Sequence, residues 1–216
     1  VAAAAADHMP ALALTDLGNV FALVKFYSAA RKKGIKPIIG CDIWLADASQ
    51  PDKPSRILLL AQNYDGYHRL SEFLTQAYLN NPHRGRAMLD KAWLRSQGTD
   101  GLIALSGAQW GDVGLALLND SWDTARALAQ DWSDLFPDRY YLEIQRNGRP
   151  EAEVHLVQAV ALASELDLPI VATHTVQCPA RDDFKAHEAR VCIAEGYMLA
   201  DRRRPLHFNP EDYFKS

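Results

Sequence analysis

The stretch from Ala11 to Gly40 constrains the fold of this chain more than any other. An apolar run of strand length, Ala11 to Leu14, leads into a turn rich in Asp, Gly and Asn and then into a helical period. Gly34 ends that period, and a second apolar run begins at Ile35. This order predicts a β-α-β unit with parallel strands and a right-handed crossover. The expected apolar positions of the helix are Val20, Leu23, Val24 and Tyr27.

Strand-length apolar runs alternate with helical patterns along nearly the whole chain, and about six strands with helical crossovers can be counted. The chain holds no Gly-x-Gly-x-x-Gly fingerprint and no phosphate-binding Gly-Lys-Ser/Thr loop. The pattern therefore favours a parallel α/β barrel lacking one strand over an open dinucleotide-binding sheet. A third strand is expected at Arg56–Ala61, and a polar loop over residues 81–87 is expected to precede a helix from Leu89 to Arg95.

Composition narrows the class of protein. With 216 residues, 48% of them hydrophobic and 23% charged, a single folded domain is the default. A formal net charge of −4 argues against a free-standing nucleic-acid binder, although it leaves room for local basic patches. Three scattered cysteines without a CxxC pair fit a reducing cytosol, and no apolar run reaches transmembrane length. We expect a cytoplasmic protein that makes no contact with a membrane.

The two ends of the chain predict a longer parent. The opening residues VAAAAAD lack the basic start and long apolar core of a signal peptide and are typical of the second half of a helix. No methionine begins the chain, and the polar tail includes a helix-start pattern at Asn209 to Asp212. We interpret the chain as part of a larger protein, with the strand before its first helix absent.

Sites in parallel α/β barrels lie on the loops after the strands, so residues at those positions form the candidate site. Among them the sequence offers two or three candidate metal ligands, Asp16, Asp42 and His174, and a lone histidine there is more often hydrogen-bonded locally. Cys41 is expected to be a buried, inert thiol. From residues alone the site is degraded or absent. The residues expected at the barrel mouth are Asp16, Leu17, Cys41, Asp42, Ser106 to Gln109, Glu143 and His174 to Gln177.

Several short segments occur in an order that resembles one known family. They include ALALTD, NVFALVKFYSAARKKGIKPIIGCDIWL, LLLAQNYDGYHRL, LIALSGAQWGDVG and DDFKAHEARVCIAEG. Together they are similar to the N-terminal PHP (polymerase and histidinol phosphatase) domain of bacterial DNA polymerase III alpha subunits, of the proteobacterial type. The resemblance covers residues 1–216 as one PHP domain. It implies a distorted seven-stranded β/α barrel, related to the TIM barrel, that lacks its first strand here.

The resemblance also implies that the family's three-metal site is degenerate in this chain. The Thr-Asp-His motif appears here as Thr15-Asp16-Leu17, and Gly-Cys-Glu appears as Gly40-Cys41-Asp42 with a shorter carboxylate. Leucine, alanine and threonine offer no lone pairs in place of the lost ligands, and an arginine repels cations. The degenerate ligand positions are Leu17, Asp42, Arg56, Ala108, Thr175 and Gln177.

A PHP domain without its metals implies a non-catalytic role, with no catalytic residue, metal or cofactor of its own. Its implied partners are the rest of the polymerase alpha chain and the separate proofreading exonuclease subunit. DNA contacts and Mg²⁺-dependent DNA synthesis would belong to other parts of the parent chain. The alternative is a metal-dependent phosphoesterase or 3′-5′ exonuclease whose altered ligand set is Asp16, Asp42 and His174.

Overall fold

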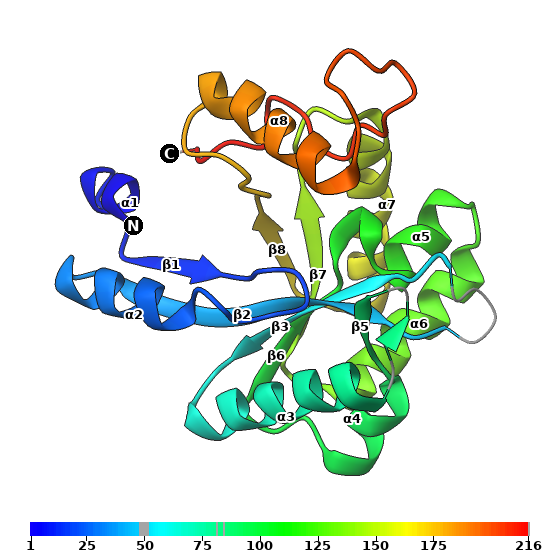
Figure 1. Ribbon diagram of the computed structural model, residues 1–216. Coiled ribbons are helices and arrows are strands. Elements are labelled where there is room, and N and C mark those ends of the chain that lie inside the picture. Colours follow the sequence, from blue (N-terminus) through cyan, green and yellow to red (C-terminus); the bar gives the residue numbers. More distant parts are fainter. Residues whose placement is uncertain (48–51, 81, 84, 216) are drawn as a thin grey trace.

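The computed structural model describes residues 1–47, 52–80, 82–83 and 85–215. Eight strands form one mixed sheet, in the order β4-β5-β2-β3-β6-β7-β8, with β1 also paired to β2 (Figure 1). The strands are β1 (Ala11–Leu14), β2 (Lys36–Leu45), β3 (Arg56–Ala61), β4 (Pro82–His83), β5 (Arg86–Leu89), β6 (Leu102–Leu105), β7 (Tyr140–Gln145) and β8 (Ile170–Thr173). The helices are α1 (Ala2–Ala6), α2 (Leu23–Lys32), α3 (Tyr64–Asn80), α4 (Lys91–Gln97), α5 (Asp112–Leu118), α6 (Trp122–Leu135), α7 (Pro150–Leu166) and α8 (Phe184–Glu195), with short 3-10 turns η1 (Ala108–Trp110) and η2 (Arg181–Asp183).

The first β-α-β unit forms as predicted. β1 pairs in parallel with the start of β2, from Ala11 opposite Lys36 to Leu14 opposite Ile39. Gly34 has a φ of +73°, a conformation that glycine reaches without steric cost, and so it lets the chain leave α2 for β2. The expected burial of the helix is wrong in part, because Val24 is 72% exposed on the outer side of α2.

The direction of β3 corrects the prediction of an all-parallel sheet. β3 is antiparallel to both of its neighbours, β2 and β6. A parallel pair needs a crossover, usually a helix, whereas no helix is described between β2 and β3. As a result, β3 begins beside the C-terminal end of β2. Its first residue, Arg56, lies opposite Trp44.

A further strand was missed around β5. Residues 81–87 were expected to be a polar loop and Leu89 the start of a helix, but Ala87, Met88 and Leu89 are buried in β5 beside the end of β2. The helix begins later, at Lys91, where the side chain of Asp90 accepts a hydrogen bond from the Ala92 amide. Residues 81 and 84 lie outside the described part of the chain.

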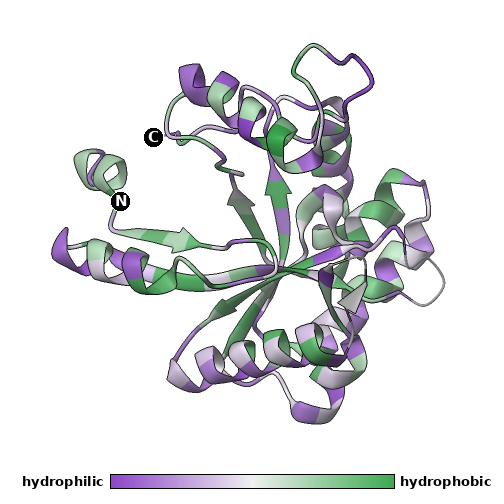
Figure 2. Cartoon of the chain, viewed as in Figure 1, coloured by the Kyte–Doolittle hydropathy of each residue, from purple (hydrophilic) through white to green (hydrophobic). Residues whose placement is uncertain are grey.

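The predicted α/β class with a curled, barrel-like sheet is confirmed. The main core lies between the sheet and helices α3 to α7, around fully buried Trp132, Phe136 and Phe73. Figure 2 shows the hydrophobic residues on the strands and on the helix faces turned toward them. Burial of each such side chain contributes about 1.5–3 kcal/mol. No helix in the described segments is long and apolar enough to cross a membrane.

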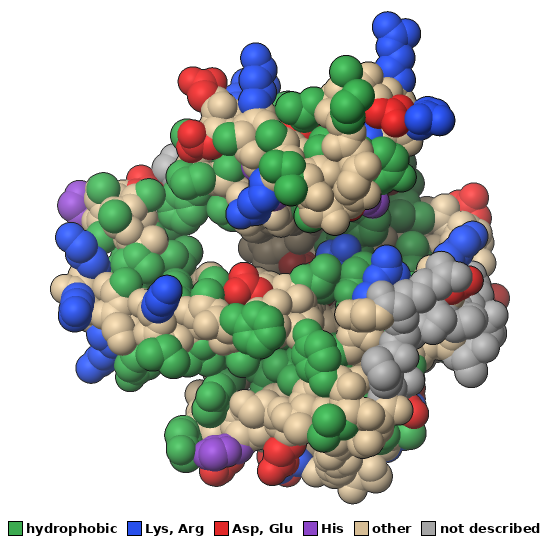
Figure 3. All heavy atoms as spheres, viewed as in Figure 1, with side chains coloured by type: hydrophobic (Ala, Val, Ile, Leu, Met, Phe, Trp, Pro, Cys, Tyr) green, Lys and Arg blue, Asp and Glu red, His purple; other side chains and the backbone are tan. Residues whose placement is uncertain are grey.

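The curl stays open between β1 and β8. Each of these strands pairs with one neighbour in the sheet, β1 with β2 and β8 with β7. Figure 3 shows the resulting opening between the N-terminal layer of α1, β1 and α2 and the C-terminal segment around α8. A separate small core of Ala4, Ala30 and Ile35 holds that N-terminal layer together.

Candidate functional site

The loop after β1 lies against the middle of β2. The Gly18 amide donates to the Asp42 carbonyl at 2.7 Å, and the Asp42 amide donates to the Asp16 carbonyl at 3.2 Å. A Cβ on Gly40 would come within 2.7 Å of the Leu59 carbonyl oxygen, so only glycine fits between the strands here. Asp16 and Asp42 are thereby brought together, as the sequence predicts, although Asp42 lies inside β2 rather than after its end. The side chain of Leu17 is 39% exposed at this loop.

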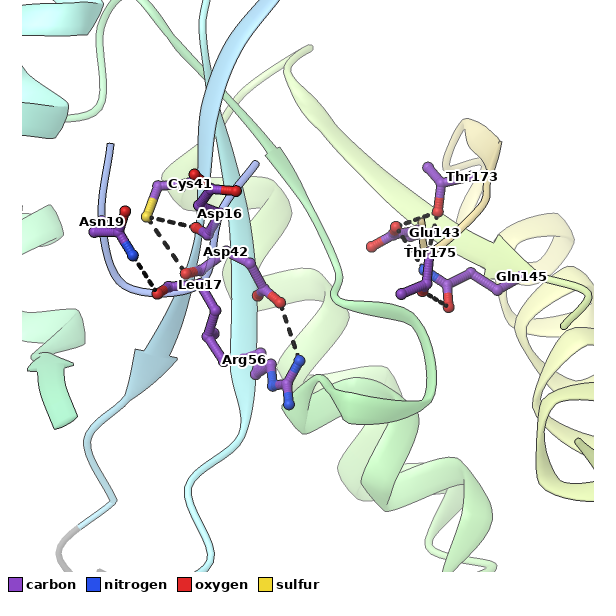
Figure 4. Close-up of polar contacts among 10 residues, drawn as sticks. All are labelled: Asp16, Leu17, Asn19, Cys41, Asp42, Arg56, Glu143, Gln145, Thr173 and Thr175. Atoms are coloured by element: carbon purple, nitrogen blue, oxygen red, sulfur yellow. Dashed lines mark hydrogen bonds and ion pairs between the residues drawn. The ribbon is translucent and has the colours of Figure 1, made fainter. Parts of the chain in front are cut away.

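Asp42 forms an ion pair with Arg56 across the β2–β3 register. The guanidinium Nη1 donates to Asp42 Oδ2 at 3.2 Å (Figure 4). Burial raises the pKa of Asp42, while the charge and hydrogen bond of Arg56 oppose that rise. The other carboxylate oxygen, Oδ1, is buried without a partner among the described residues. Two of the expected ligand positions are therefore occupied by an internal salt bridge.

Arginines and tryptophans alternate around the mouth in a row that we call the Arg–Trp ladder. The Arg56 guanidinium lies 4.3 Å from the ring centroid of Trp44 and 5.5 Å from that of Trp110. The Arg86 guanidinium lies 4.8 Å from the ring centroid of Trp44, and the Arg149 guanidinium lies 5.9 Å from that of Trp110. Each contact is a cation–π interaction worth about 0.5–1 kcal/mol when exposed and more when desolvated. The ladder links β5, β2, β3, η1 and the start of α7.

Glu143 is a second buried carboxylate at the mouth, and no cation pairs with it among the described side chains. It is 3% exposed in β7, where the Thr173 hydroxyl and the Gln145 amide donate to its Oε1. Burial raises the pKa of Glu143 above its ordinary value near 4.5. The hydrogen bonds from Thr173 and Gln145 lower that pKa, and the charge of Asp42 raises it further. Figure 4 shows this cluster apart from the Asp42–Arg56 pair, with Thr175 donating to Gln145 Oε1 at 3.2 Å.

His174 is held by the C-terminal segment. Its Nε2 lies 2.9 Å from the Glu211 carbonyl oxygen and 3.1 Å from that of Tyr213, so this nitrogen donates a proton between two acceptors. A ligand nitrogen would have to point its lone pair at the metal. The backbone amide of Gln177 also donates to the same segment, at the Asp212 carbonyl. Nε2 of His174 is therefore not available to a metal ion, and Nδ1 is the ring nitrogen that keeps a lone pair.

Cys41 and Ala108 complete the expected mouth. Burial, with the charge of Asp42, raises the pKa of the Cys41 thiol to about 12, and this thiol donates to the Asp16 carbonyl at 3.2 Å. It is therefore a poor nucleophile and a poor metal ligand. Ala108 is fully buried in the turn after β6. Across the described ranges, no group of three or more His, Cys, Asp or Glu residues is arranged to hold a metal ion.

Comparison with protein families matches the PHP domain over residues 1–147, which is more than half of the chain. The chain belongs to the PHP domain family. Among curated proteins, the DNA polymerase III subunit alpha of Neisseria meningitidis serogroup A is 50% identical over 95% of the chain. The Pseudomonas aeruginosa and Escherichia coli proteins of the same name are 45% and 41% identical over 96% and 99% of it. The chain spans 18% of the length of each of these relatives.

Comparison with solved structures finds a putative metal-dependent phosphoesterase from Bifidobacterium adolescentis. It is 12% identical, its TM-score is 0.36, and the match covers 80% of this chain and 79% of the other.

The residues of this PHP domain do not fit a metal cluster. A metal needs several lone pairs converging on one point, and metals that share bridging ligands bind as a unit. Here Asp42 already pairs with Arg56, and the Nε2 proton of His174 points at carbonyl oxygens. The expectation that no metal ion binds near Asp16 stays a prediction, as do the roles assigned to the degenerate positions.

Sequence reasoning missed the Arg–Trp ladder. It placed Glu143 at the mouth, but not the Thr173 hydroxyl and Gln145 amide that donate to it. Arg56 was expected there as a lost ligand, but its tryptophan partners lie 12 and 54 positions away and carry no spacing signal. Glu143 is the single acid of the strand YYLEIQ, and that position was the available signal for a buried carboxylate.

Proposed function

We propose that this PHP domain is a non-catalytic part of a DNA polymerase III alpha chain that acts in chromosome replication. Its role is to support the adjoining polymerase and to dock the separate proofreading exonuclease subunit. Relatives at 41–50% identity carry the polymerase name, which supports this assignment. The observation that supports the non-catalytic part is the Asp42–Arg56 salt bridge, which joins two of the degenerate ligand positions.

The salt bridge opposes metal binding in two ways. Its guanidinium supplies the positive charge that Asp42 would otherwise take from a cation, and it repels a cation that approaches. Removal of Arg56 from this pair would leave a buried carboxylate uncompensated, so the pair is the stable arrangement in this fold. Mg²⁺ for DNA synthesis would then be bound elsewhere in the parent chain, which would also contact DNA and act in the cytoplasm.

The competing function is a phosphoesterase or 3′-5′ exonuclease that uses Asp16, Asp42 and His174. Its one favourable observation is the buried Oδ1 of Asp42, which lacks a partner among the described residues and is a free acceptor. The hydrogen bonds of His174 to the carbonyls of Glu211 and Tyr213 leave Nδ1 as its one nitrogen for a metal ion, and the Asp42–Arg56 salt bridge opposes this function.

Metal content and nuclease rate of the parent alpha chain separate the two functions. We expect less than about 0.1 zinc or manganese ion per chain after dialysis, and no 3′-5′ cleavage of a labelled strand when the proofreading subunit is absent. The matched control is Asp42→Asn, which should leave both values unchanged. Stoichiometric metal together with a cleavage rate that Asp42→Asn abolishes would reverse the assignment.

Docking of the proofreading subunit is tested by chemical cross-linking of the complex. Lysine-reactive cross-linking followed by mass spectrometry should join that subunit to lysines within residues 1–216. Cross-links confined to the remainder of the alpha chain would place the docking surface outside this domain. This result is independent of the metal measurement, so the two parts of the proposal can fail separately.

A further inference from the structure

Among the described helices of ten or more residues, α2 has the fewest buried side chains. Its one fully buried residue is Ala30, and only Leu23 and Phe26 are otherwise partly covered on its inner side. Phe21, just before the helix, is 87% exposed, and Val24 is 72% exposed. A single exposed apolar side chain is ordinary on a protein surface, so the exposure of Phe21 matters only together with the charges beside it.

The same segment concentrates positive charge. Between Leu17 and Cys41 the sequence contains no Asp or Glu, although the formal net charge of the whole chain is −4. Figure 3 shows lysine and arginine side chains over this layer, at the left of the view. With Phe21, the exposed cations form what we call the α2 surface: Lys25, Arg31, Lys32, Lys33 and Lys36.

The charges of the α2 surface are not neutralised by carboxylates of the described residues. Among the residues that the structure describes, none of its five cations forms an ion pair, whereas many arginines elsewhere are paired with carboxylates. Lys25 and Lys32 are two helical turns apart and share the outer face, about 10 Å along the axis. That length matches about three phosphates at roughly 3.4 Å per nucleotide of a stacked strand.

We propose that the α2 surface binds single-stranded DNA, with its cations on the phosphate backbone and the Phe21 ring stacked on an unpaired base. Lysine is depleted in protein–protein interfaces, so a lysine-rich face favours a nucleic acid over an acidic protein. Cations beside an exposed aromatic ring are the usual chemistry of single-strand recognition. The choice of DNA as the polyanion rests on the proposed function in a DNA polymerase chain.

The salt dependence of binding tests the cationic part. The parent alpha chain with Lys25→Gln, Lys32→Gln and Lys33→Gln is titrated with a labelled oligothymidylate between about 50 and 200 mM salt. The plot of log affinity against log salt has a negative slope, and we expect it to become shallower by about 2 in the variant. Each of the three lost phosphate contacts on a single strand contributes about 0.7 to the slope. The matched control replaces three exposed cations on other surfaces, Lys53→Gln, Lys185→Gln and Arg202→Gln.

The stacking part is tested with Phe21→Ala, which removes an exposed ring and leaves the core intact. Affinity for the oligothymidylate should fall about tenfold, while affinity for a duplex of equal length stays unchanged. A lysine variant with the same slope as its control would overturn the proposal, and Phe21→Ala with unchanged single-strand affinity would overturn the stacking. If the parent chain fails to extend a primed template, the proposed function fails instead, so the two failures are distinguishable.

Discussion

Asp42 and Glu143 are two buried carboxylates at the same mouth, and each is accommodated by different chemistry. Asp42 keeps a cation beside it, because Arg56 donates to its Oδ2 at 3.2 Å. Glu143 has only neutral donors, the Thr173 hydroxyl and the Gln145 amide. The pKa of each carboxyl is raised by burial, but only that of Asp42 is pulled back by a guanidinium. The fold thus balances one buried acid with a counter-charge and surrounds the other with neutral donors.

The largest expected effect comes from removing the cation on the Asp42 side. Arg56→Met should lower the free energy of unfolding by about 2 kcal/mol at pH 7, because it leaves a buried carboxylate unpaired and breaks two contacts of the Arg–Trp ladder. The loss should shrink toward pH 4, since Asp42 can then take up a proton. Urea unfolding at several pH values measures both effects.

The control is the double variant Arg56→Met with Asp42→Asn, which removes both charges. It should recover most of the lost stability, because no uncompensated charge remains. Equal losses in the single and double variants would mean that packing against Trp44 and Trp110, rather than the charge, accounts for the effect.

A smaller effect is expected on the Glu143 side, and it appears as a pH dependence. A carboxyl whose folded pKa is raised binds its proton more tightly when folded, so stability falls as pH rises from about 4.5 through the raised pKa. The slope over that window is about 1.4 kcal/mol per pH unit. Glu143→Gln keeps the acceptor for Thr173 and should remove this slope. A Glu143→Gln profile parallel to that of the wild type would show that folding does not raise the pKa of Glu143.

The smallest expected effect is that of restoring one ligand. Leu17→His places an imidazole at the loop after β1, but Asp42 stays paired with Arg56. Zinc and manganese content should therefore equal that of the wild type by atomic emission. The matched comparison is Leu17→His with Arg56→His, which also frees Asp42. Stoichiometric metal in Leu17→His alone would show that the two sides of the mouth are more similar than the geometry indicates.

The sequence predicted those parts of the fold that local patterns determine. Ala11–Leu14 is a strand with the predicted bounds, and Arg56–Ala61 likewise, because short apolar runs between turn signals are strong strand patterns. The prediction that Asp16 and Asp42 meet is also confirmed, since a parallel β-α-β unit brings its loop to the neighbouring strand.

The remaining features depend on contacts that no local pattern records. The direction of β3 is set by its pairing with β2 and β6, and the apolar run of β5 is too short to separate a strand from a helix start. The carbonyl partners of His174 lie 37 and 39 positions along the chain, so no local pattern predicts these hydrogen bonds. Long-range hydrogen bonds of this kind arise only from the folded chain.

The separate small core of Ala4, Ala30 and Ile35 has a consequence for cooperativity. Three buried side chains supply far less burial than the main cluster, so the N-terminal layer can open while the rest stays folded. Backbone amides of α2 and β1 should then exchange with deuterium through a partial opening, well before those of β6 and β7. The layer that carries the α2 surface is thus a unit of the fold with its own, lower protection.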